Sequence, residues 1–247
     1  MRADQIGVQL YTLRDLTAAD MIGTLRRLAE IGYRAVEFAG FGNSSPQAIK
    51  PVLDALGMQA IAAHIGIADW EQAPARVFGD LHTLGAQYAV VPSVAPEDRT
   101  PEQMGPLLEK LARWGEASRA AGIRLAYHNH DFEFATGAGG TFYEALLAQT
   151  DPDLVQLELD VYWVQYAGFD PVEILRANPG RVPLLHVKDM APSGKDMAVA
   201  GEGILPWDRI LGAADAGGTE WFIVEHDRPV DALRDVERAL RYLEGRL

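Results

Sequence analysis

Acidic and imidazole side chains gather at the ends of short apolar runs in this sequence. Four of the six histidines, His64, His128, His130 and His186, lie at such ends, and a fifth, His226, directly follows Glu225. The polar residues found there are Gln9, Tyr11, Glu37, His64, Ser93, His128, Asn129, His130, Asp160, His186, Lys188, Glu225 and His226. One strand histidine is usually hydrogen bonded within a core, and one aspartate often caps a helix. Many such groups meeting in one place would repel each other or stay unsatisfied without a cation or a substrate, so the pattern predicts a binding site.

The residue types indicate which cation such a site would hold. The chain has no cysteine, so any metal must be bound by nitrogen and oxygen. Asp160, His186 and Glu225, with one or two further histidines, make a hard-to-borderline ligand set. That set suits Mn²⁺, Co²⁺, Mg²⁺ or Zn²⁺, and the sequence leaves the choice among them open.

Strands and helices alternate along the chain. The apolar, β-branched and aromatic runs that predict strands are residues 6–11, 35–40, 59–66, 88–93, 124–130, 155–161, 183–190 and 221–227. Segments with helical spacing lie between them, and a charged amphipathic helix is expected around 231–245. Eight such units, with no Gly-x-Gly-x-x-Gly turn after the first strand, predict a single α/β domain over residues 1–247, a (β/α)₈ TIM barrel.

Glycines support this order of elements. Gly32, Gly57, Gly85 and Gly122 each follow a helical stretch and precede a strand, where a left-handed helix cap is expected. The glycine-rich GAGG at 137–140 does not leave a strand directly, so we expect a loop there rather than a phosphate cradle.

Composition narrows the class of protein. With 48% apolar and 23% charged residues the 247-residue chain should fold into a large core. A formal charge of −13 opposes binding to nucleic acid. No segment reads as a signal peptide or a membrane span, so we expect a soluble cytoplasmic protein with no membrane partner.

Alternation along the strands predicts which side chains share a face. His186 and Lys188 point the same way, and Glu225 shares the face of the apolar Ile223, which favours an inward Glu225. Glu158 lies below Asp160 on one side of its strand and is expected to support the site rather than bind the metal.

The ordered motifs resemble one known group of barrels. They are GVQLYTLRD (7–15), GYRAVEFAG (32–40), YHNHDFEF (127–134), LELDVYWV (157–164), LLHVKDM (184–190), GEGILPW (201–207) and FIVEHD (222–227). Together they resemble the sugar phosphate isomerase/epimerase superfamily of xylose isomerase-like TIM barrels.

The resemblance implies a divalent metal held by a carboxylate, an Asp, a His and a Glu. The last three correspond to Asp160, His186 and Glu225. Many members have Glu-Asn-His where this chain has His128-Asn129-His130, so His128 is expected as the fourth ligand, with Glu133 as its competitor.

The resemblance also implies a reaction, the removal of a proton α to the carbonyl of a sugar, keto-sugar or inosose. Glu225 would be the base, and Lys188 or a histidine such as His128 the opposing acid. An isomerase or epimerase is the first expectation. HNHDFEF resembles the branch of inosose dehydratases and keto-glycoside enzymes, so a dehydratase or another lyase is the second.

The resemblance supplies substrate contacts as well. The expected contact residues are Glu37, His64, His130, Glu133, Trp163 and Glu202, with Tyr11 and Trp207 as further pocket walls. Lys188 is the one cation near a strand end, which favours an unphosphorylated sugar or polyol. A homo-oligomer is compatible with this kind of barrel. Two alternatives are an apurinic DNA endonuclease, which the charge disfavours, and a non-catalytic sugar-binding barrel, which the replacement by His128 leaves open.

Overall fold

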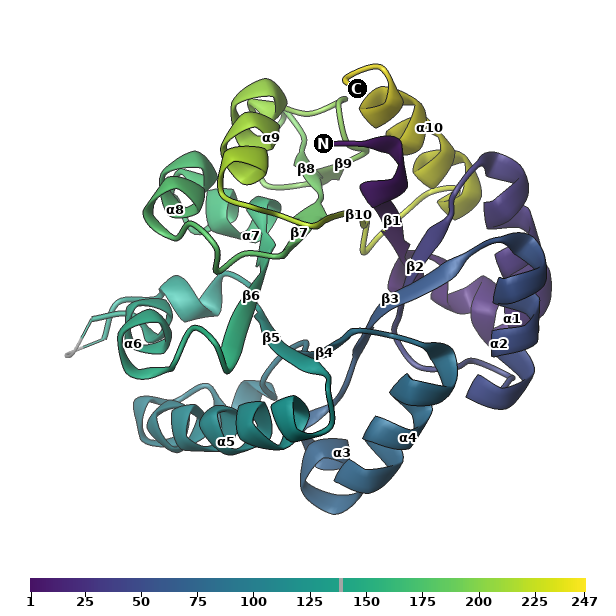
Figure 1. Cartoon of the computed structure of the whole chain (residues 1–247). Coiled ribbons are helices and arrows are strands. Elements are labelled where there is room, and N and C mark those ends of the chain that lie inside the picture. The colour runs from purple at the N-terminus through teal and green to yellow at the C-terminus, as the bar shows by residue number, and fades with distance from the viewer. Residues whose placement is uncertain (138–139) are drawn as a thin grey trace.

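A closed barrel of parallel strands forms the centre of the protein (Figure 1). The computed structural model describes residues 1–137 and 140–247, so the middle of GAGG lies outside the described residues. The barrel strands are β1 (Ile6–Gln9), β2 (Ala35–Phe38), β3 (Gln59–His64), β4 (Tyr88–Val91), β5 (Arg124–His128), β6 (Val155–Asp160), β7 (Leu184–Val187) and β10 (Trp221–Val224). Each pairs with its neighbours along the chain, and β1 pairs with β10 to close the ring. The predicted (β/α)₈ barrel is confirmed.

Helices surround this ring (Figure 1). They are α1 (Arg14–Ile31), α2 (Pro46–Leu56), α3 (Ile67–Gln72), α4 (Pro74–Leu84), α5 (Pro101–Ala120), α6 (Phe142–Gln149), α7 (Val161–Tyr166), α8 (Pro171–Ala177), α9 (Trp207–Ala216) and α10 (Ala232–Glu244). Short 3₁₀ turns are η1 (Ala3–Gln5), η2 (Leu10–Leu13), η3 (Pro96–Asp98) and η4 (Phe132–Phe134). Gly57 and Gly85 end α2 and α4 with φ values of 61° and 77°, the left-handed caps that the sequence predicts.

The lower interior of the barrel is filled with apolar side chains. They form a buried cluster of Ala35, Ile61, Ala62, Tyr88, Val90, Ala126, Leu184 and Ile223. Five of them lie two residues before polar groups, namely Ala35 before Glu37, Ala62 before His64, Ala126 before His128, Leu184 before His186 and Ile223 before Glu225. Because residues two apart share a face of a strand, this plug directs those polar side chains into the space above it.

A two-stranded sheet and a loop after β7 are held by one buried carboxylate. The sheet pairs β8 (Asp189–Met190) with β9 (Met197–Ala198). Asp189 accepts hydrogen bonds from the backbone amides of Gly201 at 2.9 Å, Gly203 at 3.2 Å and Leu205 at 3.1 Å, and from Trp207 Nε1 at 2.6 Å. A Cβ at Gly203 would lie 2.2 Å from Asp189 Oδ1, so only glycine fits there.

Trp207 is therefore not a wall of the pocket, and that prediction is wrong. Its ring is buried against the core and its indole nitrogen is bound to Asp189. From the sequence alone, a tryptophan at the start of α9 is expected at the rim of the barrel. The hydrogen bond to the Asp189 carboxylate instead holds its ring in the interior.

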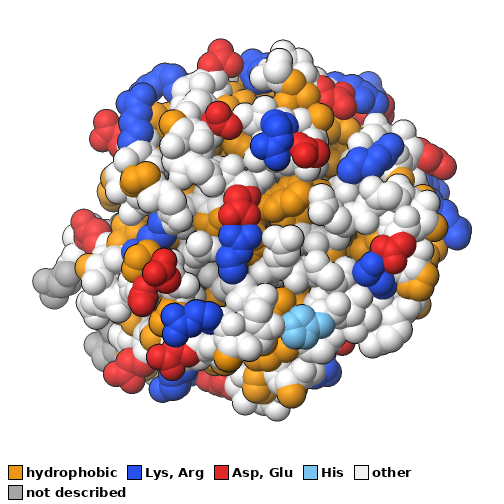
Figure 2. Space-filling view, viewed as in Figure 1, with side chains coloured by type: hydrophobic (Ala, Val, Ile, Leu, Met, Phe, Trp, Pro, Cys, Tyr) orange, Lys and Arg blue, Asp and Glu red, His pale blue; other side chains and the backbone are white. Residues whose placement is uncertain are grey.

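The outer surface carries mixed charge. On the face shown in Figure 2, acidic and basic side chains lie interspersed, often next to each other, without a broad patch of one sign. Within residues 1–137 and 140–247, every helix falls short of the length and apolar character needed to cross a bilayer.

Asp189 should contribute strongly to stability. Asp189→Ala would leave several buried donors without an acceptor, and we expect the free energy of unfolding to fall by about 3 kcal/mol or more. Chemical denaturation measures this loss. Asp153→Ala, at an exposed position, is the control and should change stability by no more than about 0.5 kcal/mol. Equal effects of the two substitutions would contradict the assigned role.

Candidate active site

A cavity of about 620 Å³ opens at the carboxyl ends of the barrel strands. Its lining residues are Tyr11, Arg14, Ala39, His64, Pro92, Ser93, His128, His130, Trp163, Lys188, Met197, Glu225, Asp227 and Arg228. Ligand sites in β/α barrels lie at this end, because the loops that follow the strands converge there. The structure therefore brings together six residues expected at the site from the sequence, namely His64, His128, His130, Trp163, Lys188 and Glu225, and it adds Tyr11 as a wall.

Four side chains at the floor of this cavity form a group that we call the ligand cluster. It consists of His128, Asp160, His186 and Glu225, each of which offers one ligand atom within 4.8 Å of the others. His186 Nδ1 lies 2.8 Å from Glu225 Oε2 and 3.9 Å from Asp160 Oδ2. His128 Nε2 also lies 3.9 Å from Asp160 Oδ2. These are the four residues proposed as metal ligands from the sequence.

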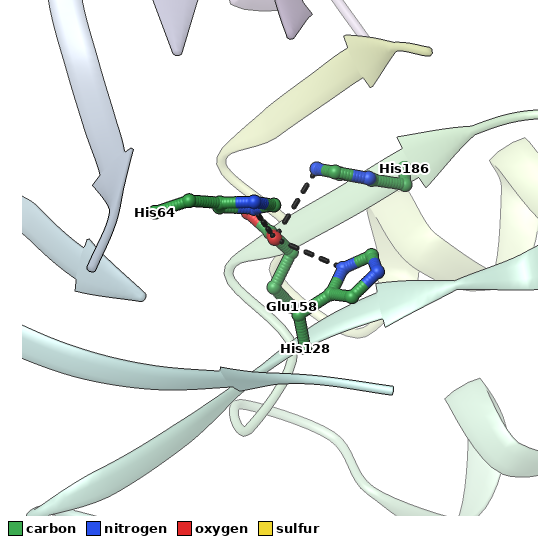
Figure 3. Close-up of side chains that lie close together, drawn as sticks. All are labelled: His64, His128, Glu158 and His186. Carbon is green, nitrogen blue, oxygen red and sulfur yellow. Dashed lines mark hydrogen bonds and ion pairs between the residues drawn. The ribbon is translucent and has the colours of Figure 1, made fainter. Parts of the chain in front are cut away.

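A second group of side chains, which we call the basal cluster, contacts the imidazoles of His128 and His186 at the ring nitrogens that face away from the ligand cluster. It contains Glu37, His64 and Glu158 and shares His128 and His186 with the ligand cluster. The three imidazoles converge on one oxygen, Glu158 Oε2, as Figure 3 shows. The distances are 2.8 Å from His64 Nε2, 3.1 Å from His128 Nδ1 and 3.2 Å from His186 Nε2. Glu37 Oε2 lies 2.9 Å from His186 Nε2.

The two clusters use opposite nitrogens of each shared ring. His128 turns Nδ1 to the basal cluster and Nε2 to the ligand cluster, and His186 does the reverse. An imidazole that donates its N–H to a carboxylate keeps a lone pair on the other nitrogen. His128, bonded to Glu158 through Nδ1, is therefore suited to bind a cation in the ligand cluster through Nε2, as hydrogen-bonded carboxylates commonly arrange for metal-binding histidines. Burial would lower the pKa of His186, but Glu158 and Glu225 raise it well above its usual value, so this ring would have to lose a proton to bind a cation.

Burial and neighbouring charges shift the pKa values of Glu37 and Glu158, the two carboxyl groups of the basal cluster, in opposite directions. Burial, with the charge of Glu158 close by, raises the pKa of Glu37 to about 7. Burial acts on Glu158 in the same direction, but His186 and His64 hold its pKa well below the usual range. Burial also lowers the pKa of His128 to about 4, so this ring is neutral and able to bind a metal at ordinary pH.

Neighbouring groups hold both the backbone and the carboxylate of Asp160. Its Oδ1 accepts a hydrogen bond from the amide of Trp163 at 3.1 Å and caps α7. The side chain of Asn129 holds its backbone, accepting from Asp160 N at 3.0 Å and donating to Asp160 O at 3.3 Å. Asp160 Oδ2 is buried, pairs with Lys188 Nζ at 2.9 Å and lies 3.9 Å from His128 Nε2 and from His186 Nδ1. This oxygen, in a set of two imidazoles and two carboxylates, fits a divalent cation.

Lys188 is a buried ammonium group beside the ligand cluster. Its Nζ lies 2.9 Å from Asp160 Oδ2, 2.7 Å from Glu225 Oε2 and 2.8 Å from Asp227 Oδ1. Burial alone would lower the pKa of Lys188, but these three carboxylates raise it well above its usual value. Carboxylates thus outnumber the ammonium group at this side of the ligand cluster, which favours the binding of a further cation.

Glu133 neither reaches this cavity nor competes as a metal ligand, so its predicted roles are wrong. It accepts hydrogen bonds from Tyr127 Oη and from the amide of His130, both at 2.8 Å. Tyr127 precedes His128 in β5 and so points to the opposite face of the sheet, away from the barrel interior. The HNHDFEF segment folds back on that outer face, where Glu133 is fully buried.

Glu37 and Glu202 also depart from their predicted role as substrate contacts. Glu37 is fully buried and bound to His186, below the residues that line the cavity. Glu202 pairs with Arg238 of α10 at 3.0 Å, at an exposed position on the outside of the barrel. The bonds from its loop to Asp189 turn GEGILPW toward α10 instead of the cavity.

Several lining residues were missed from the sequence. Asp227 follows Glu225 by two positions, so strand alternation could have placed it on the same face. Arg14 and Arg228 follow the first and last strands and line the same cavity because β1 pairs with β10. The expectation of an unphosphorylated substrate rested on the absence of such cations, and these two arginines remove that support.

Buried Glu133 should make stability depend on pH. Its pKa rises from 4.5 to about 7, mainly through burial, so between these values the folded chain holds a proton that the unfolded chain has lost. Its contribution is complete below about pH 4.5 and disappears as pH rises through about 7, by at most about 3 kcal/mol. The unfolding free energy of wild type minus that of Glu133→Gln should therefore fall between about pH 5 and pH 8 in chemical denaturation.

The control for this measurement is Glu97→Gln, at an exposed position. Its difference from wild type should stay constant over the same pH range. Parallel pH curves for wild type and Glu133→Gln would contradict the raised pKa.

Comparison with known proteins supports the resemblance noted in the sequence. Over 195 residues the chain is 28% identical to an inosose dehydratase of Geobacillus kaustophilus (strain HTA426), covering 67% of this chain and 61% of that protein. The chain thus spans about three fifths of that relative's length. A solved sugar phosphate isomerase/epimerase from Parabacteroides distasonis ATCC 8503 is 28% identical, with a TM-score of 0.81 over 99% of this chain and 95% of that one.

A more distant structure shares the fold. A protein described as IolI, solved with a bound zinc atom, is 15% identical and superposes with a TM-score of 0.75 over 98% of this chain and 97% of that one. The family model described as xylose isomerase-like TIM barrel matches residues 25–246. This chain belongs to the xylose isomerase-like TIM barrel family.

Proposed function

We propose that this protein is a divalent-metal-dependent enzyme that removes a proton α to the carbonyl of a sugar, keto-sugar or inosose. The observation that carries the proposal is the ligand cluster, in which His128, Asp160, His186 and Glu225 each offer one ligand atom within 4.8 Å of the others beside an open cavity. The Geobacillus inosose dehydratase and the Parabacteroides isomerase/epimerase support a substrate of the sugar or inosose class.

His128, Asp160, His186 and Glu225 would hold the metal. When bound, a divalent ion there would polarise the substrate carbonyl and make the neighbouring C–H more acidic. Mn²⁺, Co²⁺, Mg²⁺ and Zn²⁺ all suit this mixed nitrogen and oxygen set. The zinc in the IolI structure supports a metal in this fold without selecting the ion.

Glu225 is the proposed base. Burial would raise its pKa, but Lys188 and His186 lower it well below the usual range, so the carboxylate is ionised and able to accept a proton. Glu225 lines the cavity, where the reacting carbon can approach it. Its position at the end of β10, above the apolar plug, fixes the direction of that approach.

Lys188 and the histidines are the polar groups that would act together with the base, Glu225, on the substrate. The Lys188 ammonium lines the cavity, and its positive charge would stabilise an oxygen that becomes negative during the reaction. Burial, with the nearby His128 and Lys188, lowers the pKa of His130 to about 2, so this ring is neutral. Its Nδ1 has no hydrogen-bond partner among the described residues and is free to orient a sugar hydroxyl.

A dehydratase is the second candidate, favoured by His128. A symmetric epimerase uses two carboxylates on opposite sides of the carbon, whereas this cavity presents Glu225 with Lys188 and imidazoles. After proton removal, an acid of this kind could protonate a leaving hydroxyl group as readily as it could return a proton to carbon. The inosose dehydratase relatives support this outcome. A non-catalytic sugar-binding barrel is disfavoured, because the ligand cluster and an ionised base are both present.

Solvent-deuterium incorporation tests the reaction. Wild-type protein loaded with Mn²⁺ or Co²⁺ should exchange the α-protons of a ketose or inosose with D₂O, as measured by NMR. Glu225→Gln should slow that exchange by about 100-fold or more, because the base is lost. Glu202→Gln, on the outside of the barrel, is the matched control and should exchange at the wild-type rate. Exchange by Glu225→Gln at the wild-type rate would falsify the assigned base.

The basal cluster predicts an effect on metal affinity. Glu158→Gln keeps the size of the side chain but weakens its hold on His128 and His186, so Co²⁺ affinity measured by calorimetry should fall about 10- to 100-fold. Glu133→Gln also neutralises a buried carboxylate, but outside both clusters, and should leave Co²⁺ affinity unchanged. If both variants bind Co²⁺ like wild type, the basal carboxylates do not orient the ligands.

A further inference from the structure

A second cavity adjoins the candidate active site. It has a volume of about 360 Å³ and shares Trp163, Met197 and Arg228 with the first cavity. Its other lining residues are Tyr162, Tyr166, Lys195, Asp196 and His226. We call the first the inner cavity and the second the outer cavity. The two cavities are therefore neighbours that border on the same indole ring.

The two cavities differ in chemistry. The inner cavity holds the acids, imidazoles and ammonium group that could act on a carbonyl. The outer cavity is walled by three aromatic side chains of α7, Tyr162, Trp163 and Tyr166. The Trp163 and Tyr166 rings lie 5.3 Å apart at 64°, and those of Tyr162 and Trp163 4.9 Å apart at 76°. Sugar rings and planar groups pack well against such amphipathic aromatic surfaces, which combine apolar area with polar edges.

The aromatic wall is fixed to the ligand cluster. Helix α7 begins directly after Asp160, and Asp160 Oδ1 accepts the hydrogen bond of the Trp163 amide. The residue that offers a metal-ligand oxygen therefore also sets the first turn of the helix that carries all three aromatic rings. A group bound against this wall would stand at a defined position relative to the reacting centre.

The opposite wall is also anchored. Tyr162 Oη donates a hydrogen bond to the carbonyl of Lys195 at 2.5 Å, which ties α7 to the turn between β8 and β9. Lys195 Nζ lies 3.9 Å from the centre of the Tyr166 ring, and Met197 pairs with Met190 in the small sheet. The outer cavity is thus bounded by a helix and a paired turn, both connected to the barrel.

We propose that the substrate is longer than one sugar ring, namely a glycoside whose second ring lies in the outer cavity against Trp163 and Tyr166. This inference rests on the proposed function, which places the reacting ring in the inner cavity. The aromatic wall contributes to affinity for the second ring and takes no part in proton transfer, because its side chains lack the acids and bases of the inner cavity.

Calorimetry with matched ketoses tests this proposal. D-fructose has one ring, whereas lactulose is the same ketose carrying a galactosyl group. Wild-type protein loaded with Co²⁺ should bind lactulose about 10-fold more tightly than fructose. Tyr166→Ala should weaken lactulose binding about 3- to 10-fold and change fructose binding less than twofold, in keeping with the contribution of one aromatic contact. Tyr166→Phe keeps the ring and should behave like wild type.

Tyr11→Ala is the matched control, because Tyr11 borders only the inner cavity. This substitution should weaken the binding of fructose and of lactulose to the same degree. Methyl and p-nitrophenyl β-D-glucoside, compared in the same way, distinguish a sugar from an aryl group as the second ring. The proposal is overturned if wild type shows no preference for lactulose, including no binding of either ketose, or if Tyr166→Ala weakens both ketoses equally.

Deuterium exchange separates this proposal from the proposed function. Selective loss of lactulose binding in Tyr166→Ala, with no exchange into either ketose, would support the second-ring subsite and contradict the proton-abstraction reaction. Exchange into both ketoses, with equal binding of both by wild type and Tyr166→Ala, would support the reaction and overturn the subsite.

Discussion

The ring of His186 stands between two sets of buried carboxylates. Glu37 and Glu158 face its Nε2, and Glu225 faces its Nδ1, while no part of the side chain is exposed to solvent. Buried carboxylates are costly unless hydrogen bonds or opposite charges compensate them. The imidazoles and the Lys188 ammonium provide that compensation, and a divalent cation bound by the ligand cluster would add to it. The protonation and orientation of the whole cavity floor depend on this arrangement.

The rest of the barrel holds that arrangement in place. The apolar plug fills the lower interior, so polar side chains near the strand ends have only the space above it. Asn129 binds the backbone of Asp160 from the neighbouring strand, and Asp160 in turn caps α7. Asp189, directly after Lys188, binds the loop that leads to α9. Each of these contacts fixes the backbone within a few residues of a group that faces the cavity.

The candidate site therefore has two sides with different proposed roles, the inner cavity and the aromatic wall of the outer cavity. Glu225, Lys188 and the imidazoles lie together where proton transfer next to a carbonyl is proposed, and their pKa values follow from burial and from each other. The aromatic residues of α7 lie to one side, where they can bind a group but cannot exchange protons with it. The proposed reaction and the proposed second-ring site thus depend on different elements, which meet at Asp160 and Trp163.

The sequence by itself determined the order of strands and helices, the closed barrel and the ligand cluster. These follow from local regularities, because a period of two places a side chain on a face and the end of a parallel strand places it at one edge of the barrel. Asp160, His186 and Glu225 could be located in this way, whereas His128 as the fourth ligand came from the resemblance to the family, which left Glu133 as its competitor. The position of Glu37 below His186 could not be predicted, because it depends on the stagger between two strands that are distant in the sequence.

Only the tertiary structure decided the positions of the loop residues. Glu133 turned to the outer face with Tyr127, and Trp207 and Glu202 followed the hydrogen bonds of their loop to Asp189. Arg14 and Arg228 came to the same cavity through the pairing of the first strand with the last. Loop directions and barrel closure arise from contacts between residues far apart in the chain, and no local pattern of residue types encodes them.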